Sequence, residues 1–264
     1  MKLDDIGTQL LFCTVPIFIE KENGSGTGTG FLFNFLTNTN KSIPLLITNL
    51  HVVKNAKKIM IEFHGSTNSF PDKAKRIKVE IAGDFIKKYI PFSQDFNEDI
   101  FALPIGGILD QVIKQKGEIF FKSITQSFCF TKSDLENCAA IENITIIGYP
   151  KGIYDTINWL PLVRQGITAT PVWNNFNGKS SFLIDAGIFP GSSGSPVFLY
   201  NQGSYSSNSG ITIGTRLAFV GIISETYIDK SESNSNTYLG LGKVINSDKI
   251  LEFVKNLVNK IEHK

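Results

Sequence analysis

Short apolar runs alternate with turn-forming residues along almost the whole chain. About a dozen runs, among them Leu10–Glu20, Leu45–Leu50, Ile144–Tyr149 and Val197–Tyr200, are rich in Ile, Val, Phe and Thr and end at Gly, Pro, Asn or Ser. No long helical pattern separates these runs. Short strands at this spacing predict an all-β protein built as a sandwich or as a pair of barrels.

One segment near the end of the chain has helical periodicity. Between Asn246 and Ile261 the apolar residues recur three or four positions apart, which places them on one face of a helix. Ser247 is a suitable N-cap in front of Asp248. We therefore expect a helix over residues 247–261 that packs its apolar face against the body of the protein.

The apolar pattern is interrupted over Pro104–Glu118, where glycines are frequent. We place a subdomain boundary in this stretch, which divides the chain into residues 1–112 and 113–264. Polar stretches elsewhere predict four surface loops. These loops are Gly65–Lys75, Asn174–Ser180, Asn201–Gly210 and Asp229–Asn236.

The composition excludes several classes of partner. The 264 residues suffice for one large domain or two packed subdomains. A net charge of +2 gives no reason to expect a nucleic acid or a membrane surface as partner. No run of about 18 apolar residues is present, so no membrane span is expected. Residues 1–5 contain two acids and no apolar core follows them, which argues against a signal peptide.

The cysteines point to a reducing compartment. There are three, Cys13, Cys129 and Cys138, and their spacing fits no metal site. Cys13 and Cys129 lie in apolar runs and are expected to be buried. Since at most one disulfide can form, the fold does not depend on a disulfide framework, and we expect a cytoplasmic protein. We expect neither a metal nor a cofactor.

The segment Pro190–Phe198 carries the strongest chemical signal. Three serines lie among glycines and prolines directly before an apolar run. Glycines allow a tight turn that exposes backbone N–H groups, and a serine on such a turn can act as a nucleophile beside an oxyanion hole. A plain polar turn between two strands is the alternative.

A nucleophilic serine needs a histidine as base and a carboxylate that orients the histidine. The chain has three histidines. His263 is the penultimate residue and is expected to be solvated. His64 closes an apolar run before Gly65 and is expected at the edge of a loop. His51 follows a strand-like run that ends in a polar step, where a histidine taken alone is more often structural than catalytic.

Several short motifs, in the right order, resemble those of the trypsin-like (chymotrypsin-fold) serine proteases, especially the bacterial branch. Residues 48–53 (Thr-Asn-Leu-His-Val-Val) resemble the histidine segment and follow a Gly-Thr-Gly-Phe step at 28–31. Residues 97–103 resemble the aspartate segment. Residues 191–196 (Gly-Ser-Ser-Gly-Ser-Pro) resemble the nucleophile loop, and their Gly-Ser-Pro ending is similar to the glutamyl-endopeptidase branch. Residues 148–150 (Gly-Tyr-Pro) match a step in the second barrel of the family.

The resemblance implies two packed six-stranded antiparallel Greek-key β-barrels with a C-terminal helix. It also implies a serine endopeptidase that works through an acyl-enzyme intermediate. Ser193 would be the nucleophile, His51 the base and then the acid, and Asp99 the residue that orients His51. The N–H groups of Gly191 and Ser193 would form the oxyanion hole. His51 and Asp99 would come from residues 1–112 and Ser193 from residues 113–264.

The departures from the family pattern concern activation. Ser192 stands where zymogens of the trypsin type have an aspartate that receives a newly cut N-terminus. Activation by that route is therefore not expected. Val52 and Phe189 stand where secreted animal members have cysteines, so their usual disulfides are absent.

The expected substrate-binding residues are Gly187, Ser224, Glu225 and Thr226. By count, Gly187 lies at the base of the specificity pocket and brings no charge. The strand that holds the other three resembles the one that pairs with substrate backbone. Ile223 replaces the histidine of glutamyl endopeptidases. We therefore expect an uncharged side chain, small or medium in size, at the cleaved position.

Two alternatives stay open at the level of the sequence. A protease-like fold can serve as a binding or scaffold module, because fold does not imply function. A protease can also be active only after an effector binds. For the serine endopeptidase that the resemblance implies, the expected partner is a protein or peptide substrate.

Overall fold

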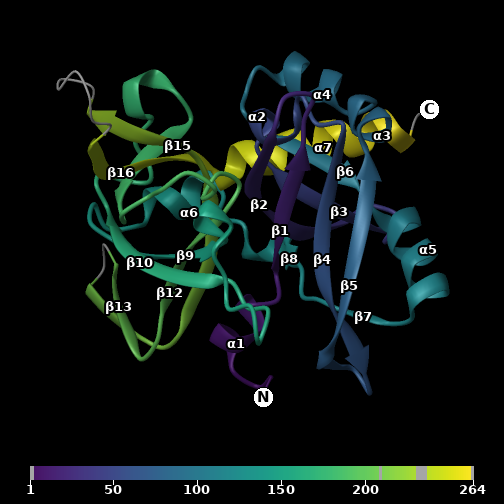
Figure 1. The fold of residues 1–264 in the computed structure, drawn as a ribbon. Helices are drawn as coiled ribbons and strands as arrows, with labels where there is room; N and C mark the ends of the chain where they lie inside the picture. The colour runs from purple at the N-terminus through teal and green to yellow at the C-terminus, as the bar shows by residue number, and fades with distance from the viewer. Residues whose placement is uncertain (1–2, 208–209, 230–236, 263–264) are drawn as a thin grey trace.

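The first half of the chain forms a β-sheet. The structure is a computed structural model that describes residues 3–207, 210–229 and 237–262. The sheet has the strand order β5-β4-β1-β2-β3-β6, with β7 paired to β4 and β8 paired to β2 (Figure 1). Its strands are β1 (Thr14–Glu20), β2 (Ser25–Leu36), β3 (Ser42–Thr48), β4 (Lys58–Thr67), β5 (Phe70–Ala82), β6 (Phe101–Pro104), β7 (Ile119–Phe120) and β8 (Ile124–Thr125).

The second half forms a closed antiparallel barrel with the order β10-β11-β16-β15-β12-β9. Its strands are β9 (Asn143–Gly148), β10 (Leu162–Thr168), β11 (Ser181–Asp185), β12 (Pro196–Asn201), β15 (Arg216–Asp229) and β16 (Thr237–Asn246). A hairpin of β13 (Ser204–Ser207) and β14 (Gly210–Ile213) extends from it. The mostly β fold predicted from the sequence, with a closed barrel in the second half, is confirmed. In the first half, however, no pairing of β5 with β6 closes the sheet within the described residues.

Most helices are short and lie at the ends of strands. They are α1 (Ile6–Leu10), α2 (Leu50–Val53), α3 (Gly83–Lys87), α4 (Ile90–Phe96), α5 (Gly106–Lys116) and α6 (Lys132–Glu136). The C-terminal helix α7 (Ser247–Glu262) confirms the predicted helix. Ser247 belongs to its first turn, and the Ser247 hydroxyl donates to the carbonyl of Phe130 at 3.0 Å.

An apolar core joins the two halves and α7. Phe31 of β2 and Phe219 of β15 are both fully buried, with ring centroids 5.3 Å apart. Phe253 of α7 packs in the same cluster, 5.2 Å from the ring of Phe96. In Figure 1 the yellow helix α7 accordingly runs behind the sheet of the first half. Burial of large aromatic side chains between the halves fixes the relative position of the segments that carry the candidate site.

Two predicted loops are hairpins instead. Most of Gly65–Lys75 belongs to β4 and β5, which continue past the body of the sheet to a turn at Asn68 and Ser69. Asn201–Gly210 contains β13. The strands in both segments are exposed to solvent, and their residues are mostly polar. The alternation of apolar and polar residues by which a half-buried strand is recognised in a sequence is therefore missing. Asn174–Ser180 contains no strand, as predicted.

The predicted boundary after residue 112 falls within α5 and stays a prediction. The short strands β7 and β8, which follow it in sequence, pair with the first sheet. Residues 230–236 of the fourth predicted loop and His263 lie outside the described residues. Within the described part of the chain, no helix is long and apolar enough to cross a membrane.

The three cysteines are free and buried, as predicted for Cys13 and Cys129. Burial raises the pKa of the Cys13 thiol to about 12 and that of Cys129 likewise to about 12. The thiolate is the reactive form of cysteine, so these thiols are inert packing groups.

Candidate active site

A histidine and an aspartate meet at the ends of two strands of the first sheet. His51 lies in α2, which begins two residues after β3 ends, and Asp99 lies just before β6. His51 Nδ1 is 2.7 Å from Asp99 Oδ2, and the His51 backbone N–H donates to Asp99 Oδ1 at 3.0 Å. The Asn49 side-chain amide donates to the Asp99 carbonyl at 2.8 Å. Both carboxylate oxygens of Asp99 therefore hold His51.

This contact fixes the protonation pattern of the ring. An ionised carboxylate only accepts hydrogen bonds, so the neutral ring carries its proton on Nδ1. Nε2 then carries the lone pair and can accept a proton. Asp95, another acid of this region, instead lies 3.5 Å from Lys260 of α7.

The candidate nucleophile loop is held by three other segments. The Thr29 N–H of β2 donates to the Ser193 carbonyl at 3.0 Å. The Lys151 N–H donates to the Pro190 carbonyl at 2.7 Å, and the Gly194 N–H donates to the Ile223 carbonyl at 2.9 Å. The loop thus touches the first sheet, the turn after β9 and the long strand β15. These bonds hold Ser193 at the junction of the two halves.

Glycine is required at two positions of this loop. Gly191 has φ +86° and Gly194 has φ +84°, in the left-handed region. A Cβ at Gly191 would lie 2.5 Å from Lys151 N, and one at Gly194 would lie 2.1 Å from Thr29 O. Any side chain at either position would push the loop away from its supports.

Burial distinguishes the three serines. Ser192 is 3% exposed and Ser195 is 1% exposed, whereas Ser193 is half-buried. Ser195 Oγ has no hydrogen-bond partner and faces Gly148. Of the three hydroxyls, that of Ser193 is therefore the accessible one. No hydrogen bond joins Ser193 Oγ to His51 within the described residues, and this bond is often loose when no substrate is bound.

The amides of the candidate oxyanion hole have no acceptor in the part of the chain that the structure describes. In a trans peptide the carbonyl and the next N–H point in opposite directions. The Pro190 carbonyl is bound to Lys151 and the Ser192 carbonyl accepts from the Ser195 N–H at 3.0 Å. The N–H groups of Gly191 and Ser193 therefore point away from these contacts. Across the described residues, neither amide has a protein acceptor.

The Thr29 hydroxyl reinforces this arrangement. It donates to the Gly191 carbonyl at 3.2 Å and accepts from the Tyr149 N–H at 3.0 Å. One side chain of the first sheet thus holds both the loop and the Gly-Tyr-Pro turn. Sequence reasoning did not single out Thr29, although the Gly-Thr-Gly-Phe step contained it.

The predicted substrate-binding residues lie on β15 and after β11. Ser224 is buried, and its hydroxyl donates to the Lys243 carbonyl at 3.4 Å. The exposed Glu225 carboxylate lies 3.1 Å from Lys243 Nζ. Thr226 is half-buried. Gly187 has φ +57°, and Arg164 of β10, which the sequence analysis did not consider, lies against it.

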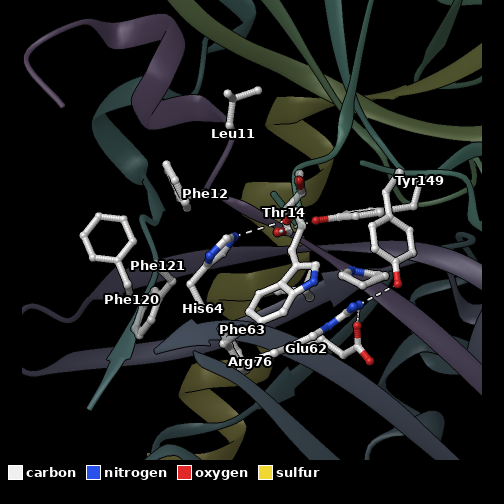
Figure 2. A pocket seen from close by; sticks show the side chains of 14 residues that line it. Leu11, Phe12, Thr14, Glu62, Phe63, His64, Arg76, Phe120, Phe121 and Tyr149 are labelled. Atoms are coloured by element: carbon white, nitrogen blue, oxygen red, sulfur yellow. Dashed lines mark hydrogen bonds and ion pairs between the residues drawn. The ribbon is translucent and has the colours of Figure 1, made fainter. Parts of the chain in front are cut away.

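A second cluster supports the turn after β9 (Figure 2). The buried Glu62 pairs with Arg76, whose guanidinium lies between the rings of Tyr154 and Trp159, 5.0 and 5.2 Å from their centroids. His64 Nε2 lies 3.1 Å from the Trp159 carbonyl. The segment after β9 is thereby fastened to β4 and β5, and this segment carries the backbone groups that hold the nucleophile loop.

The expectation that His64 lies at a loop edge is wrong. His64 lies within β4 and is 7% exposed, because β7 and the segment after β9 cover it. Burial lowers the pKa of His64, and its Nδ1 has no hydrogen-bond partner. His64 is a packing residue of this cluster, as its contact with the Phe12 ring also shows.

Comparisons with known proteins concern the family and the fold of the chain. Residues 28–205 match the family model of the trypsin-like peptidase domain. Comparison with curated protein sequences gave no match. Among solved structures, the HtrA-type protease AlgW with a tripeptide is similar with a TM-score of 0.53 and 14% identity. That match covers 95% of this chain and 62% of the AlgW chain, so this chain spans less than two thirds of that relative.

Two further structures have the same fold. Deg5 matches with a TM-score of 0.51 and 14% identity, over 93% of this chain and 88% of that one. The serine endoprotease from Yersinia pestis matches with a TM-score of 0.51 and 13% identity, over 98% of this chain and 68% of that one. At these identities the likeness concerns the fold. Since the family model covers more than half of the sequence, the chain belongs to the trypsin-like peptidase domain family.

Proposed function

We propose that the chain is a serine endopeptidase that uses Ser193, His51 and Asp99. The observation that carries this proposal is the His51–Asp99 contact, with Nδ1 and Oδ2 2.7 Å apart, in a chain of the trypsin-like peptidase family. It leaves Nε2 of His51 as a base for the one accessible serine of the loop. Peptides or proteins would be the substrates.

The proposed reaction follows from these positions. His51 Nε2 takes the Ser193 hydroxyl proton as Oγ bonds to the substrate carbonyl carbon, and the negative oxygen accepts hydrogen bonds from the Gly191 and Ser193 amides. His51 then gives the proton to the departing amine, which leaves an acyl group on Ser193. Water then attacks the ester carbon as His51 takes its proton, the bond to Ser193 Oγ breaks, His51 returns the proton to Oγ, and the carboxylic acid product leaves. Asp99 keeps the His51 proton on Nδ1 and stabilises the charged ring.

The non-catalytic alternative is not favoured. A binding module has no need of a histidine whose ring and backbone are both held by one carboxylate, nor of two amides without acceptors. A dependence on an effector has no observation in its favour either, since the loop already has its supporting hydrogen bonds. The likeness of the Gly-Ser-Pro ending to glutamyl endopeptidases is not confirmed by the comparisons.

A fluorophosphonate probe tests the proposal, since it reacts with an activated serine. We expect labelling of the wild type, and loss of labelling in Ser193→Ala and His51→Ala. Ser195→Ala is the matched control: its hydroxyl is buried without a partner, so removal costs little and labelling continues. A folded wild type that is not labelled, or labelling that persists in Ser193→Ala, would refute the proposal.

A further inference from the structure

Gly187 is the residue predicted at the base of the specificity pocket. The side chain of Arg164 occupies the space that a side chain at position 187 would fill. A Cβ built on Gly187 would lie 2.6 Å from Arg164 Nη2. The Arg164 Nε–H donates to the Ala186 carbonyl at 3.3 Å, so the guanidinium is fixed beside this turn. The absence of a side chain at Gly187 is what makes room for it.

Backbone hydrogen bonds to β16 hold the segment around Gly187. The N–H groups of Ala186 and Gly187 donate to the Gly240 carbonyl of β16 at 3.2 and 3.0 Å. Gly187 is six residues before Ser193 on the segment that leads into the nucleophile loop. Arg164 is half-buried and comes from β10, which pairs with β11 just before this segment. The guanidinium therefore reaches the pocket base from a neighbouring strand.

The charged groups that the structure describes around Arg164 leave its positive charge unpaired. Among the described residues, no carboxylate lies within ion-pair distance of Arg164. Asp185, two residues before Gly187, does not pair with Arg164. The Glu225 carboxylate is bound to Lys243. A second cation lies close by: Arg164 Cζ and Lys151 Nζ are 5.2 and 5.6 Å from the Phe189 ring centroid. A half-buried guanidinium with unused N–H donors favours a carboxylate, which it can bind through two parallel hydrogen bonds.

We propose that Arg164 makes the site selective for an acidic side chain, Glu or Asp, on the amino side of the cleaved bond. This inference rests on the proposed function. The uncharged pocket was expected because Gly187 at its base has no charge. The Arg164 side chain, which lies beside Gly187, brings a positive charge to this place. The determinant differs from the histidine of glutamyl endopeptidases, whose position Ile223 occupies here.

The test compares peptides that differ in the residue before the cleaved bond: Glu, Asp, Gln or Lys. We expect wild-type kcat/KM to be higher for Glu than for Gln by about 10- to 100-fold, the range of a hydrogen bond to a charged group. The Glu-to-Gln ratio falls to about one in Arg164→Gln and is intermediate in Arg164→Lys, since lysine keeps the charge and loses the two-point contact. Lys179→Gln, which removes an exposed cation elsewhere, leaves the ratio unchanged.

Three outcomes would overturn the inference, and they can be told apart. Equal kcat/KM for Glu and Gln in a wild type that the fluorophosphonate labels at Ser193 would refute the selectivity alone. A wild type that is not labelled would refute the proposed function and the selectivity with it. The wild-type ratio needs no variant, so the test does not depend on whether Arg164→Gln folds. A Glu preference that survives in folded Arg164→Gln would likewise exclude Arg164 as its cause.

Discussion

Replacement of Asp99 by asparagine isolates the step that the His51–Asp99 contact serves. Both Asp99 oxygens bind His51, one at Nδ1 and one at the backbone N–H. An asparagine has one oxygen and one NH₂ group. If its oxygen stays on the backbone N–H, its NH₂ faces Nδ1, which must then carry the lone pair. The ring proton moves to Nε2, and the ring can no longer accept the Ser193 proton.

The expected effect is large on catalysis and small on folding. A wrong histidine tautomer in such a triad lowers kcat about 10⁴-fold. This factor corresponds to a loss of about 5.5 kcal/mol of transition-state stabilisation. The His51 and Asp99 side chains are 50% and 30% exposed, so solvent screens the pair. Its contribution to the free energy of unfolding is then about 1 kcal/mol or less. Asp99→Asn should therefore be a folded protein that has lost its activity.

Three measurements check this reasoning. Peptide hydrolysis gives kcat, urea unfolding gives stability, and ¹⁵N chemical shifts of His51 report which ring nitrogen carries the proton. Asp95→Asn is the matched control, because Asp95 pairs with Lys260 and should change kcat by less than about twofold. A folded Asp99→Asn that keeps about a tenth of wild-type kcat, or keeps its proton on Nδ1, would show that Asp99 does not set the tautomer.

Three further predictions concern the nucleophile loop, the ion pair between Glu142 and Arg216 in the barrel, and His64. Gly194→Ala should abolish fluorophosphonate labelling while thermal unfolding stays cooperative, because the added Cβ would lie 2.1 Å from Thr29 O at φ +84°. Glu142→Gln should lower the free energy of unfolding in urea by about 3–5 kcal/mol, since it removes the buried carboxylate that pairs with Arg216, whose side chain is 9% exposed. Burial lowers the pKa of His64, so the folded state binds fewer protons than the unfolded state below the ordinary value of 6.5. Urea midpoints should then fall as pH drops below about 6.5 in wild type, more steeply than in His64→Phe, and parallel slopes would contradict this.

The candidate site was predictable where short segments carry their own signal. Residues 48–53 and 97–103 resemble the histidine and aspartate segments of the trypsin-like proteases, and this resemblance implied that His51 and Asp99 are partners. Their contact is a structural fact, whereas their catalytic roles stay predictions. Order along the chain selected Ser193 among three serines, and burial of Ser192 and Ser195 agrees with that choice.

Other features could not be predicted because their causes are not local. His64 has the pattern of a residue at a strand end, yet segments distant in sequence cover it. Arg164 lies on an ordinary alternating strand, and nothing near it in the sequence indicates that its side chain reaches Gly187. The hairpin β4–β5 has too few buried positions at its tip for the apolar pattern to mark it as strand.

The sequence by itself determined the β class of the fold, the C-terminal helix and the identity of the candidate chemical groups. These properties depend on local patterning and on residue types within a few positions of one another. Only the tertiary structure decided which groups share a site: the donors that bind the loop carbonyls of Pro190 and Ser193, the Thr29 bridge and the charge beside Gly187. The physical reason is that hydrogen bonding, burial and charge pairing depend on neighbours in space, and the core around Phe31 and Phe219 sets those neighbours by joining the two halves.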